Sequence, residues 1–121
     1  IPQAAAEIKA AIQGAQESAN RRVWVFAHLS HVYSDGASIY VTYAFPLEND
    51  PEATLERWIA MKTAASLAIQ RNHGTISHQH GVGMDHKPYL AVEKGELGMQ
   101  TLQSMAQVFD PSGMMNPGKL F

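Results

Sequence analysis

The sequence predicts an α+β fold in which helices cover one face of a mostly antiparallel sheet. Two segments rich in β-branched and aromatic residues, 23–33 and 38–45, flank an Asp-Gly pair, which is a strong signal for a β-hairpin. Segments 3–19 and 50–72, on either side of this hairpin, carry hydrophobic residues at helical spacing. The length of 121 residues and the hydrophobic content of 45% suit one globular domain.

Residues 3–19 are predicted to form a helix that packs closely against a sheet or another helix. Pro2 suits the first helical turn, and Asn20 suits a C-terminal cap. Close packing is expected because the inward stripe consists mostly of small side chains. Its members are Ala4, Ile8, Ala11, Ile12, Ala15 and Ala19.

The hairpin is predicted to place His31 directly opposite Tyr40. This register follows if residues 35–36 form a two-residue turn, because counting outward from the turn pairs these two positions. The face with His31 and Tyr40 would then be open, and a change of register by one residue would exchange the faces. The open face would also carry Val23, Val25, Ala27, Leu29 and Thr42, and the helix-covered face Trp24, Phe26, Ile39, Val41, Tyr43 and Phe45.

Further elements are predicted after the hairpin. A helix should run from the capping residue Asp50 to about Asn72. Residues 75–80 have the pattern of a short strand, and 87–94 and 95–109 those of a short and a longer helix. The expected inward side chains are Leu55, Ile59, Ala65 and Ile69 in the first of these helices and Leu102, Met105, Ala106 and Phe109 in the last.

Composition and charge exclude several classes of function. The net charge of -2 and the lack of a Lys/Arg cluster argue against nucleic acid as a partner. The absence of cysteine excludes disulfides, a thiolate nucleophile and a zinc-finger site. No apolar run approaches the roughly 20 residues of a membrane span, and nothing resembles a signal peptide. Ile1 is not an initiator methionine, so we expect the chain to be a fragment of a longer protein.

Two histidines form the first candidate site. His78 and His80 stand two positions apart, so on a strand both side chains point the same way. This spacing can ligate a metal, with His31 or Asp85 as a third ligand. The alternative is that one histidine satisfies backbone groups while the other lines a binding site. We expect no bound metal, because no acid immediately neighbours the pair and the chain has no cysteine.

Tyr40 facing His31 forms a candidate acid/base pair. A phenol ordinarily titrates at about pH 10, so it needs a cationic or hydrogen-bonding neighbour to exchange a proton near neutrality. The alternative is a cross-strand pair that only stabilises the hairpin.

Two further segments are predicted to present backbone to a ligand. Gly81 and Gly83 let other groups approach closely, and the turn-forming run 110–120 has a defined geometry. The glycines are not a dinucleotide fingerprint, because the third glycine is missing and no parallel strand–helix unit surrounds them.

Residues 74–83 and 109–120 resemble the C-terminal region of FAD-linked oxidases of the vanillyl-alcohol-oxidase type, and the resemblance covers the whole chain. It implies that residues 1–121 are a fragment of the C-terminal cap domain, which lies over the flavin ring and holds a small-molecule substrate. It also implies FAD as cofactor and an N-terminal FAD-binding domain that is absent from this chain.

Two branches of this family differ at the site. In the 2-hydroxy-acid dehydrogenase branch, two hairpin histidines and a Glu-His-Gly motif hold a divalent metal. Here Tyr40 stands in place of the second histidine and Gln79 in place of the glutamate, so the resemblance implies a dismantled metal site. Residues 30–33, 36–37 and 78–83, together with Tyr40, are instead similar to the alkyldihydroxyacetone-phosphate synthase branch.

The second resemblance implies roles for individual residues. Tyr40 would be the acid/base of a reaction that exchanges an acyl for an alkyl group in ether-lipid synthesis without net redox change. His78 and His80 would share the catalytic site. Substrate-binding residues would be His31 and Gln79, and cofactor-binding residues Gly81, Gly83, Asn116 and Gly118.

Alternatives stay open at this point. One is a metal-free FAD-linked oxidoreductase acting on a 2-hydroxy acid or an alcohol, and another is a stand-alone small-molecule-binding domain. Peripheral membrane association and a homodimer of the full-length protein are also open, and the location would be the cytoplasm for a bacterial source.

Overall fold

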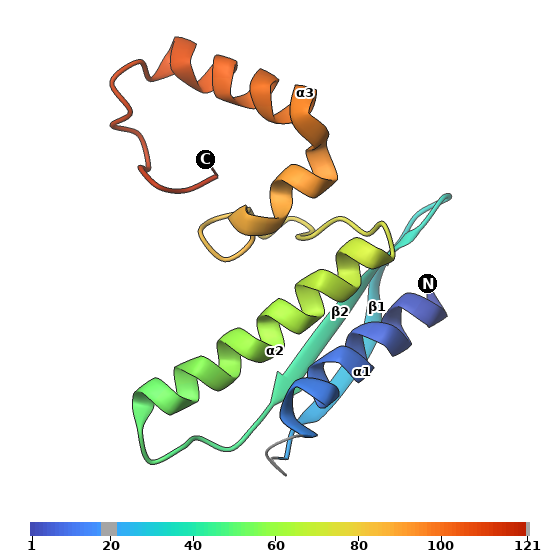
Figure 1. Cartoon of the computed structure of the whole chain (residues 1–121). Helices are drawn as coiled ribbons and strands as arrows, with labels where there is room; N and C mark the ends of the chain where they lie inside the picture. Colours follow the sequence, from blue (N-terminus) through green and yellow to red (C-terminus); the bar gives the residue numbers. More distant parts are fainter. Residues whose placement is uncertain (18–21, 121) are drawn as a thin grey trace. The chain divides into compact units, whose positions relative to one another are not determined.

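The computed structural model describes residues 1–17 and 22–120 and has the predicted α+β composition. The elements, in order, are α1 (Pro2–Glu17), β1 (Trp24–Val32), β2 (Ala37–Ala44), α2 (Pro51–Arg71) and α3 (Lys87–Phe109) (Figure 1). The chain divides into two compact units, Ile1–Asn72 and His73–Phe121, and each is described by itself.

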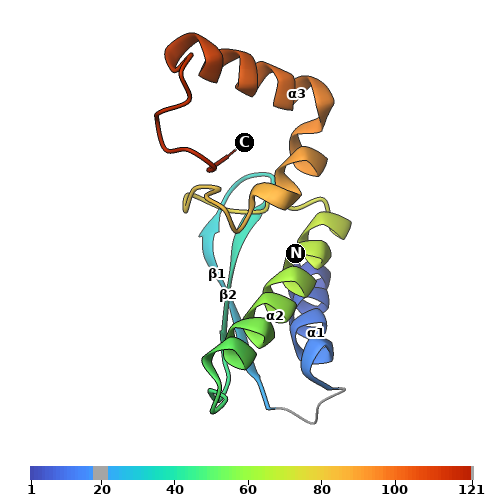
Figure 2. The same ribbon diagram turned by 60° about the vertical axis from the view of Figure 1, so that its left-hand side comes forward.

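The first unit is an antiparallel β1–β2 hairpin with α1 and α2 on one of its faces (Figures 1 and 2). Ile8 and Ile12 of α1 and Met61 and Ala68 of α2 form the buried core, as the predicted α1 stripe requires. Burial of one such large aliphatic side chain contributes roughly 1.5–3 kcal/mol. Two predicted features of α1, Ala19 and the Asn20 cap, lie outside the described residues.

The bounds of α2 agree with the prediction, and the expected inward residues Ala65 and Ile69 pack against the core, but the N-terminal half of the helix differs. Asp50 accepts a hydrogen bond from the Glu52 amide at 3.1 Å, and Asn72 caps the other end. Leu55 and Ile59, expected to point inward, are each 48% exposed. The buried side instead carries Arg57, Met61, Ser66 and Ala68. Positions 57 and 61 lie two residues, roughly 200° of helical rotation, from the predicted ones.

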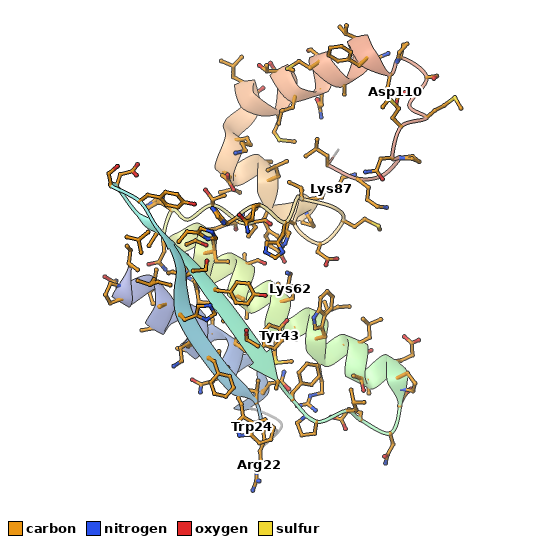
Figure 3. The ribbon with its side chains drawn as sticks, turned by 180° about the vertical axis from the view of Figure 1, so that it is seen from behind. Arg22, Trp24, Tyr43, Lys62, Lys87 and Asp110 are labelled. Atoms are coloured by element: carbon orange, nitrogen blue, oxygen red, sulfur yellow. The ribbon has the colours of Figure 1, made fainter. Side chains whose placement is uncertain are left out.

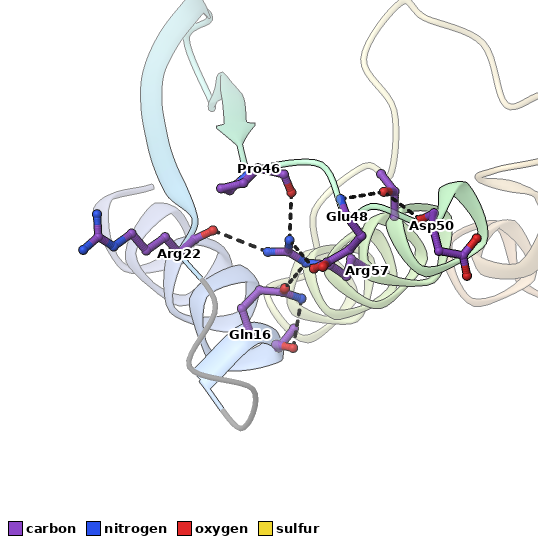
Figure 4. Close-up of polar contacts among 8 residues, drawn as sticks. Gln16, Arg22, Pro46, Glu48, Asp50 and Arg57 are labelled. Atoms are coloured by element: carbon purple, nitrogen blue, oxygen red, sulfur yellow. Dashed lines mark hydrogen bonds and ion pairs between the residues drawn. The ribbon is translucent and has the colours of Figure 1, made fainter.

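Arg57 joins the segments of the first unit (Figure 4). It is 5% exposed, and its Nε donates to Gln16 at the end of α1 at 2.8 Å. Its Nη1 donates to the Pro46 carbonyl and to the Glu48 carboxylate, each at 2.8 Å. The guanidinium lies 5.0 Å from the ring centre of Phe45. Hydrogen-bond acceptors on several sides, one of them the Glu48 carboxylate, make Arg57 compatible with burial.

The hairpin register corrects the prediction for β1. Val25 pairs with Tyr43, and both pack against the core, so this side of the hairpin faces the helices. Trp24 and Phe26, expected in the core, are 50% and 60% exposed on the open face. The expected core positions Val41, Tyr43 and Phe45 are confirmed.

The turn and a bulge explain the error. Val32 pairs with Ala37, and the Tyr33 amide donates to the Gly36 carbonyl at 2.8 Å, so four residues rather than two connect the strands. A further shift occurs between Leu29 and His31, where one extra residue of β1 has no partner on β2. The longer turn shifts the partners by two positions and keeps the faces, whereas the one-residue bulge exchanges the faces of β1 from Leu29 back to Trp24.

The second unit is built on α3. Gly95 interrupts this helix with φ 68° and ψ 172°, which confirms the two predicted helical pieces. Residues 75–80 form bends and not the predicted strand, and the Ile76 amide donates to the Glu93 carboxylate at 2.9 Å instead of to a strand neighbour. Leu102 and Ala106 are half-buried, but Met105 and Phe109 are 54% and 78% exposed, so the predicted inward face is covered only in part. Helical spacing predicts which side is apolar but not what covers it.

Among the described residues, the helices are too short or too polar to cross a membrane.

Candidate functional site

Tyr40 lies on the open face of the hairpin, as predicted. Side chains alternate along a strand, so Tyr40 points away from the helices because Val41 and Tyr43 pack against them. Its side chain is 45% exposed. The same face carries Trp24 and Phe26 on β1, and Figure 3 labels Trp24 and Tyr43 near the end of the hairpin that is remote from the turn.

His28, and not His31, lies opposite Tyr40. The two residues are direct cross-strand partners, and their rings stack with centroids 5.2 Å apart and planes 25° apart. His31 pairs with Ser38 instead, so the predicted pairing of His31 with Tyr40 is wrong. The sequence analysis missed His28 because it counted from a two-residue turn, whereas the turn has four residues and β1 has one extra residue between Leu29 and His31.

Ser30 stabilises the bulge that separates these two histidines. Its hydroxyl donates to the Ser38 hydroxyl at 3.0 Å and lies 3.1 Å from Nδ1 of His31. His31 also stacks on Tyr33, with ring centroids 6.4 Å apart. The available signal was two consecutive polar residues, Ser30 and His31, which break the alternation of the strand.

The segment of His78 and His80 has a different geometry from the predicted strand. Gln79 between them has φ 54°, in the left-handed region, so the two side chains do not follow strand alternation. His78 is half-buried, and Gln79 and His80 are exposed. The convergence of this segment with Tyr40 stays a prediction, since they belong to different units.

Glu93 holds the beginning of this segment. Its carboxylate accepts the Ile76 amide at 2.9 Å and contacts the Lys94 ammonium at 2.8 Å. Burial raises the pKa of Glu93, but the bonds from Ile76 and Lys94 outweigh it and lower the pKa overall. The carboxylate therefore remains an ionised acceptor at neutral pH.

Asp110 organises the C-terminal turn, at the end of α3 (Figure 3). Its carboxylate accepts the Met115 amide at 2.7 Å and the Met114 amide at 3.0 Å. These two bonds, that of Met115 first, lower the pKa of Asp110. The turn leads to Asn116 and Gly118, which have φ 49° and 76° and are exposed. Asparagine and glycine tolerate this left-handed conformation best.

The predicted cofactor-binding segments meet within the second unit. The Leu120 amide donates to the Gly83 carbonyl at 3.4 Å, and Lys87 Nζ to the Gly118 carbonyl at 3.5 Å. Gly81 and Gly83 have φ 76° and 57°, and an added Cβ at either would meet nothing within 4 Å. The glycine backbone carries no side chain that would block a ligand, and the Lys87 ammonium group lies in the same unit. These features fit the approach of a flat polar ring such as that of FAD.

Acid is expected to release the C-terminal turn. The folded pKa of Asp110 lies below the ordinary 3.8, so its stabilising effect is complete above that pH and is lost as the pH falls through the lowered pKa. Hydrogen exchange, corrected for intrinsic rates, should show the Met114 and Met115 amides protected at pH 7 and less protected in acid. Asp110→Ala should remove this protection at every pH, whereas the exposed control Asp85→Ala should not. Unchanged protection in Asp110→Ala would contradict the assignment.

The candidate histidines could also form a metal site. Within residues 1–17 and 22–120, the structure contains no group of three or more His, Asp or Glu side chains that could hold a metal ion. We predict that the purified protein contains no stoichiometric zinc or manganese after dialysis, because Tyr40 and Gln79 replace two family ligands. Elemental analysis measures this, and one metal ion per chain would favour the dehydrogenase alternative.

Comparisons with known proteins agree with the sequence resemblance. Residues 3–120 match the family model described as FAD linked oxidases, C-terminal domain. Alkyldihydroxyacetonephosphate synthase of Trypanosoma brucei brucei is 27% identical over 100 residues, which are 83% of this chain and 16% of that protein. The Dictyostelium discoideum enzyme of the same name is 29% identical over 97 residues, 80% of this chain and 16% of that protein.

A relative of the other branch also matches. D-2-hydroxyglutarate dehydrogenase of Stutzerimonas stutzeri is 36% identical over 69 residues, which are 57% of this chain and 14% of that protein. No solved structure matches the chain at a significant level. The matched region is 16% of the length of the two synthases. The family model covers nearly all of the chain, and the chain therefore belongs to the C-terminal domain family of the FAD-linked oxidases.

Proposed function

We propose that this chain is the substrate-facing part of a flavoenzyme of the alkyldihydroxyacetone-phosphate synthase type, with Tyr40 as its acid/base. The observation that carries the proposal is the position of Tyr40, whose phenol is 45% exposed on the helix-free face of the hairpin beside an imidazole. Tyrosine is a known general acid/base when a polar neighbour orients it. The two synthases among the relatives support this choice of branch.

The same face suits a substrate with an apolar tail. Successive pairs along the hairpin are Trp24 with Ala44, Phe26 with Thr42 and His28 with Tyr40. The exposed rings of Trp24 and Phe26 therefore extend in one line from the phenol, at strand spacing. A fatty chain can cover such rings, whereas a small hydroxy acid cannot, which favours the exchange of acyl for alkyl groups.

The remaining candidate residues have polar tasks in this proposal. His78 and His80 supply imidazoles to the phosphate-bearing headgroup, and His31 and Gln79 complete the substrate site. Gly81, Gly83, Asn116 and Gly118 hold the flavin ring through backbone groups. FAD, when bound, supplies the redox-active ring, while Tyr40 moves a proton to and from the substrate.

A direct assay of exchange tests this function. The enzyme that contains this chain is incubated with acyl-dihydroxyacetone phosphate and a labelled fatty alcohol, without an external electron acceptor. Release of fatty acid with incorporation of one labelled alkyl group is the expected result. Reduction of a dye by glycolate, D-lactate or D-2-hydroxyglutarate, without exchange, would favour the alternative oxidoreductase, which the similarity to D-2-hydroxyglutarate dehydrogenase supports.

The chain alone is expected to bind FAD weakly or not at all. The sequence has no glycine-rich loop that could hold a diphosphate, and backbone donors of such loops supply much of the cofactor affinity. We propose that a separate FAD-binding domain supplies them. Calorimetry with the isolated chain measures this, and micromolar or tighter binding would show that the proposed second domain is not needed.

A further inference from the structure

We propose that His28 is a positioning residue for Tyr40, holding the phenol ring by stacking so that its hydroxyl is directed at the substrate. The inference rests on the proposed function, in which Tyr40 transfers the proton. It assigns a task to a histidine that lies outside the motifs that carry the family resemblance, which begin in the hairpin at Ser30.

The register gives His28 this place. His28 and Tyr40 are direct partners across an antiparallel pair, where opposing side chains of one face come closest. Their ring centroids are 5.2 Å apart and the planes differ by 25°, an offset stack within the range preferred by aromatic pairs. The four-residue turn pairs His31 with Ser38, and the bulge between Leu29 and His31 then places His28, in place of Leu29, opposite Tyr40.

The hairpin fixes the backbone of Tyr40 but leaves its ring exposed, so a stacked partner is needed to hold the ring. The backbone of Tyr40 is held by its neighbour Val41, which packs against the helical core. The ring itself stands on the open face and is 45% exposed, so no core surrounds it. A solvent-exposed tyrosine samples several rotamers, and a stacked partner reduces this freedom. Catalytic groups need such restriction, because misplacement by about 1 Å can cost about 10²-fold in rate.

Substitutions in the complete flavoenzyme separate stacking from proton chemistry. His28→Ala removes the ring and is expected to lower kcat about 10- to 100-fold while KM changes little, since substrate binding does not depend on it. His28→Phe restores a flat ring without ionisable nitrogens and is expected to recover most of the lost kcat. The control His73→Ala alters an exposed histidine of the second unit and should leave kcat unchanged.

A second measurement does not depend on activity. In protein with 13C-labelled histidine, the His28 Hε1 resonance, assigned with His28→Phe, senses the ring current of a stacked tyrosine. Tyr40→Leu is expected to move this resonance downfield, and the His73 resonance should stay in place. An unmoved His28 resonance would overturn the inference.

The outcomes distinguish this inference from the proposed function. Normal kcat in His28→Ala beside a strongly impaired Tyr40→Phe would remove only the role of His28. Equal losses in His28→Phe and His28→Ala would also overturn it, because the imidazole would then act through its nitrogens. Near-normal turnover of Tyr40→Phe would remove the proposed function and this inference with it.

Discussion

Replacement of Tyr40 by phenylalanine is expected to lower turnover of the flavoenzyme by about 10²–10⁴-fold, the usual cost of losing a general acid/base. The change removes one hydroxyl from a side chain that is 45% exposed, so the protein should fold and bind FAD as before. Stopped-flow and steady-state kinetics, with the flavin content read from its absorbance, measure both parts of this expectation. We expect kcat and kcat/KM to fall together, because proton transfer is made only in the transition state.

The matched control for this variant is Tyr43→Phe. Tyr43 stands on the same strand, but it packs against the core on the helix-covered face. Loss of its hydroxyl should leave kcat close to that of the unaltered enzyme. If Tyr40→Phe retained near-normal turnover with bound flavin, the proton would be carried by another group, and the oxidoreductase would become the better proposal.

Replacement of Arg57 by alanine is expected to destabilise the first unit by about 1–3 kcal/mol, the usual cost of leaving a buried hydrogen-bond acceptor without its donor. Arg57 is 5% exposed, and its removal leaves the Gln16 amide oxygen and the Pro46 carbonyl without the donor that each has now. It also separates Glu48 from its cationic partner. Chemical denaturation followed by far-ultraviolet circular dichroism of the chain measures the loss.

Two further variants define the cause of this effect. Arg57→Lys keeps the charge but cannot donate in the same fork, so it should recover only part of the stability. Arg71→Ala removes an exposed arginine of the same helix, in its last turn, and should cost less than about 1 kcal/mol. A cost of similar size for Arg57→Ala and Arg71→Ala would contradict the role of the buried cluster.

The helix ends and the face of Tyr40 could be predicted from the sequence because they depend on local rules. Asp50, Pro51 and Asn72 delimit α2 through capping groups that act within a few residues, and the structure has these ends. Gly95 interrupts α3 where two separate helices were expected. Tyr40 lies on the open face because alternation along β2 follows from the apolar residues on either side of it.

The errors concern features that depend on contacts between distant segments. Helical spacing alone did not show that Arg57 would take an inward position on α2, since its partners Gln16 and Pro46 come from other elements. Residues 75–80 were expected to be a strand, but the Glu93 carboxylate of α3 accepts the Ile76 amide instead.

The sequence by itself determined the family, the helix ends and the identity of Tyr40, because motifs, caps and strand alternation are properties of neighbouring residues. The tertiary structure alone decided which histidine meets that tyrosine. The four-residue turn placed His31 opposite Ser38, and a bulge of one residue placed His28 opposite Tyr40. The physical reason is that the partner of a strand residue depends on the number of residues between it and the turn. One residue without a partner therefore exchanges the faces of all strand residues beyond it.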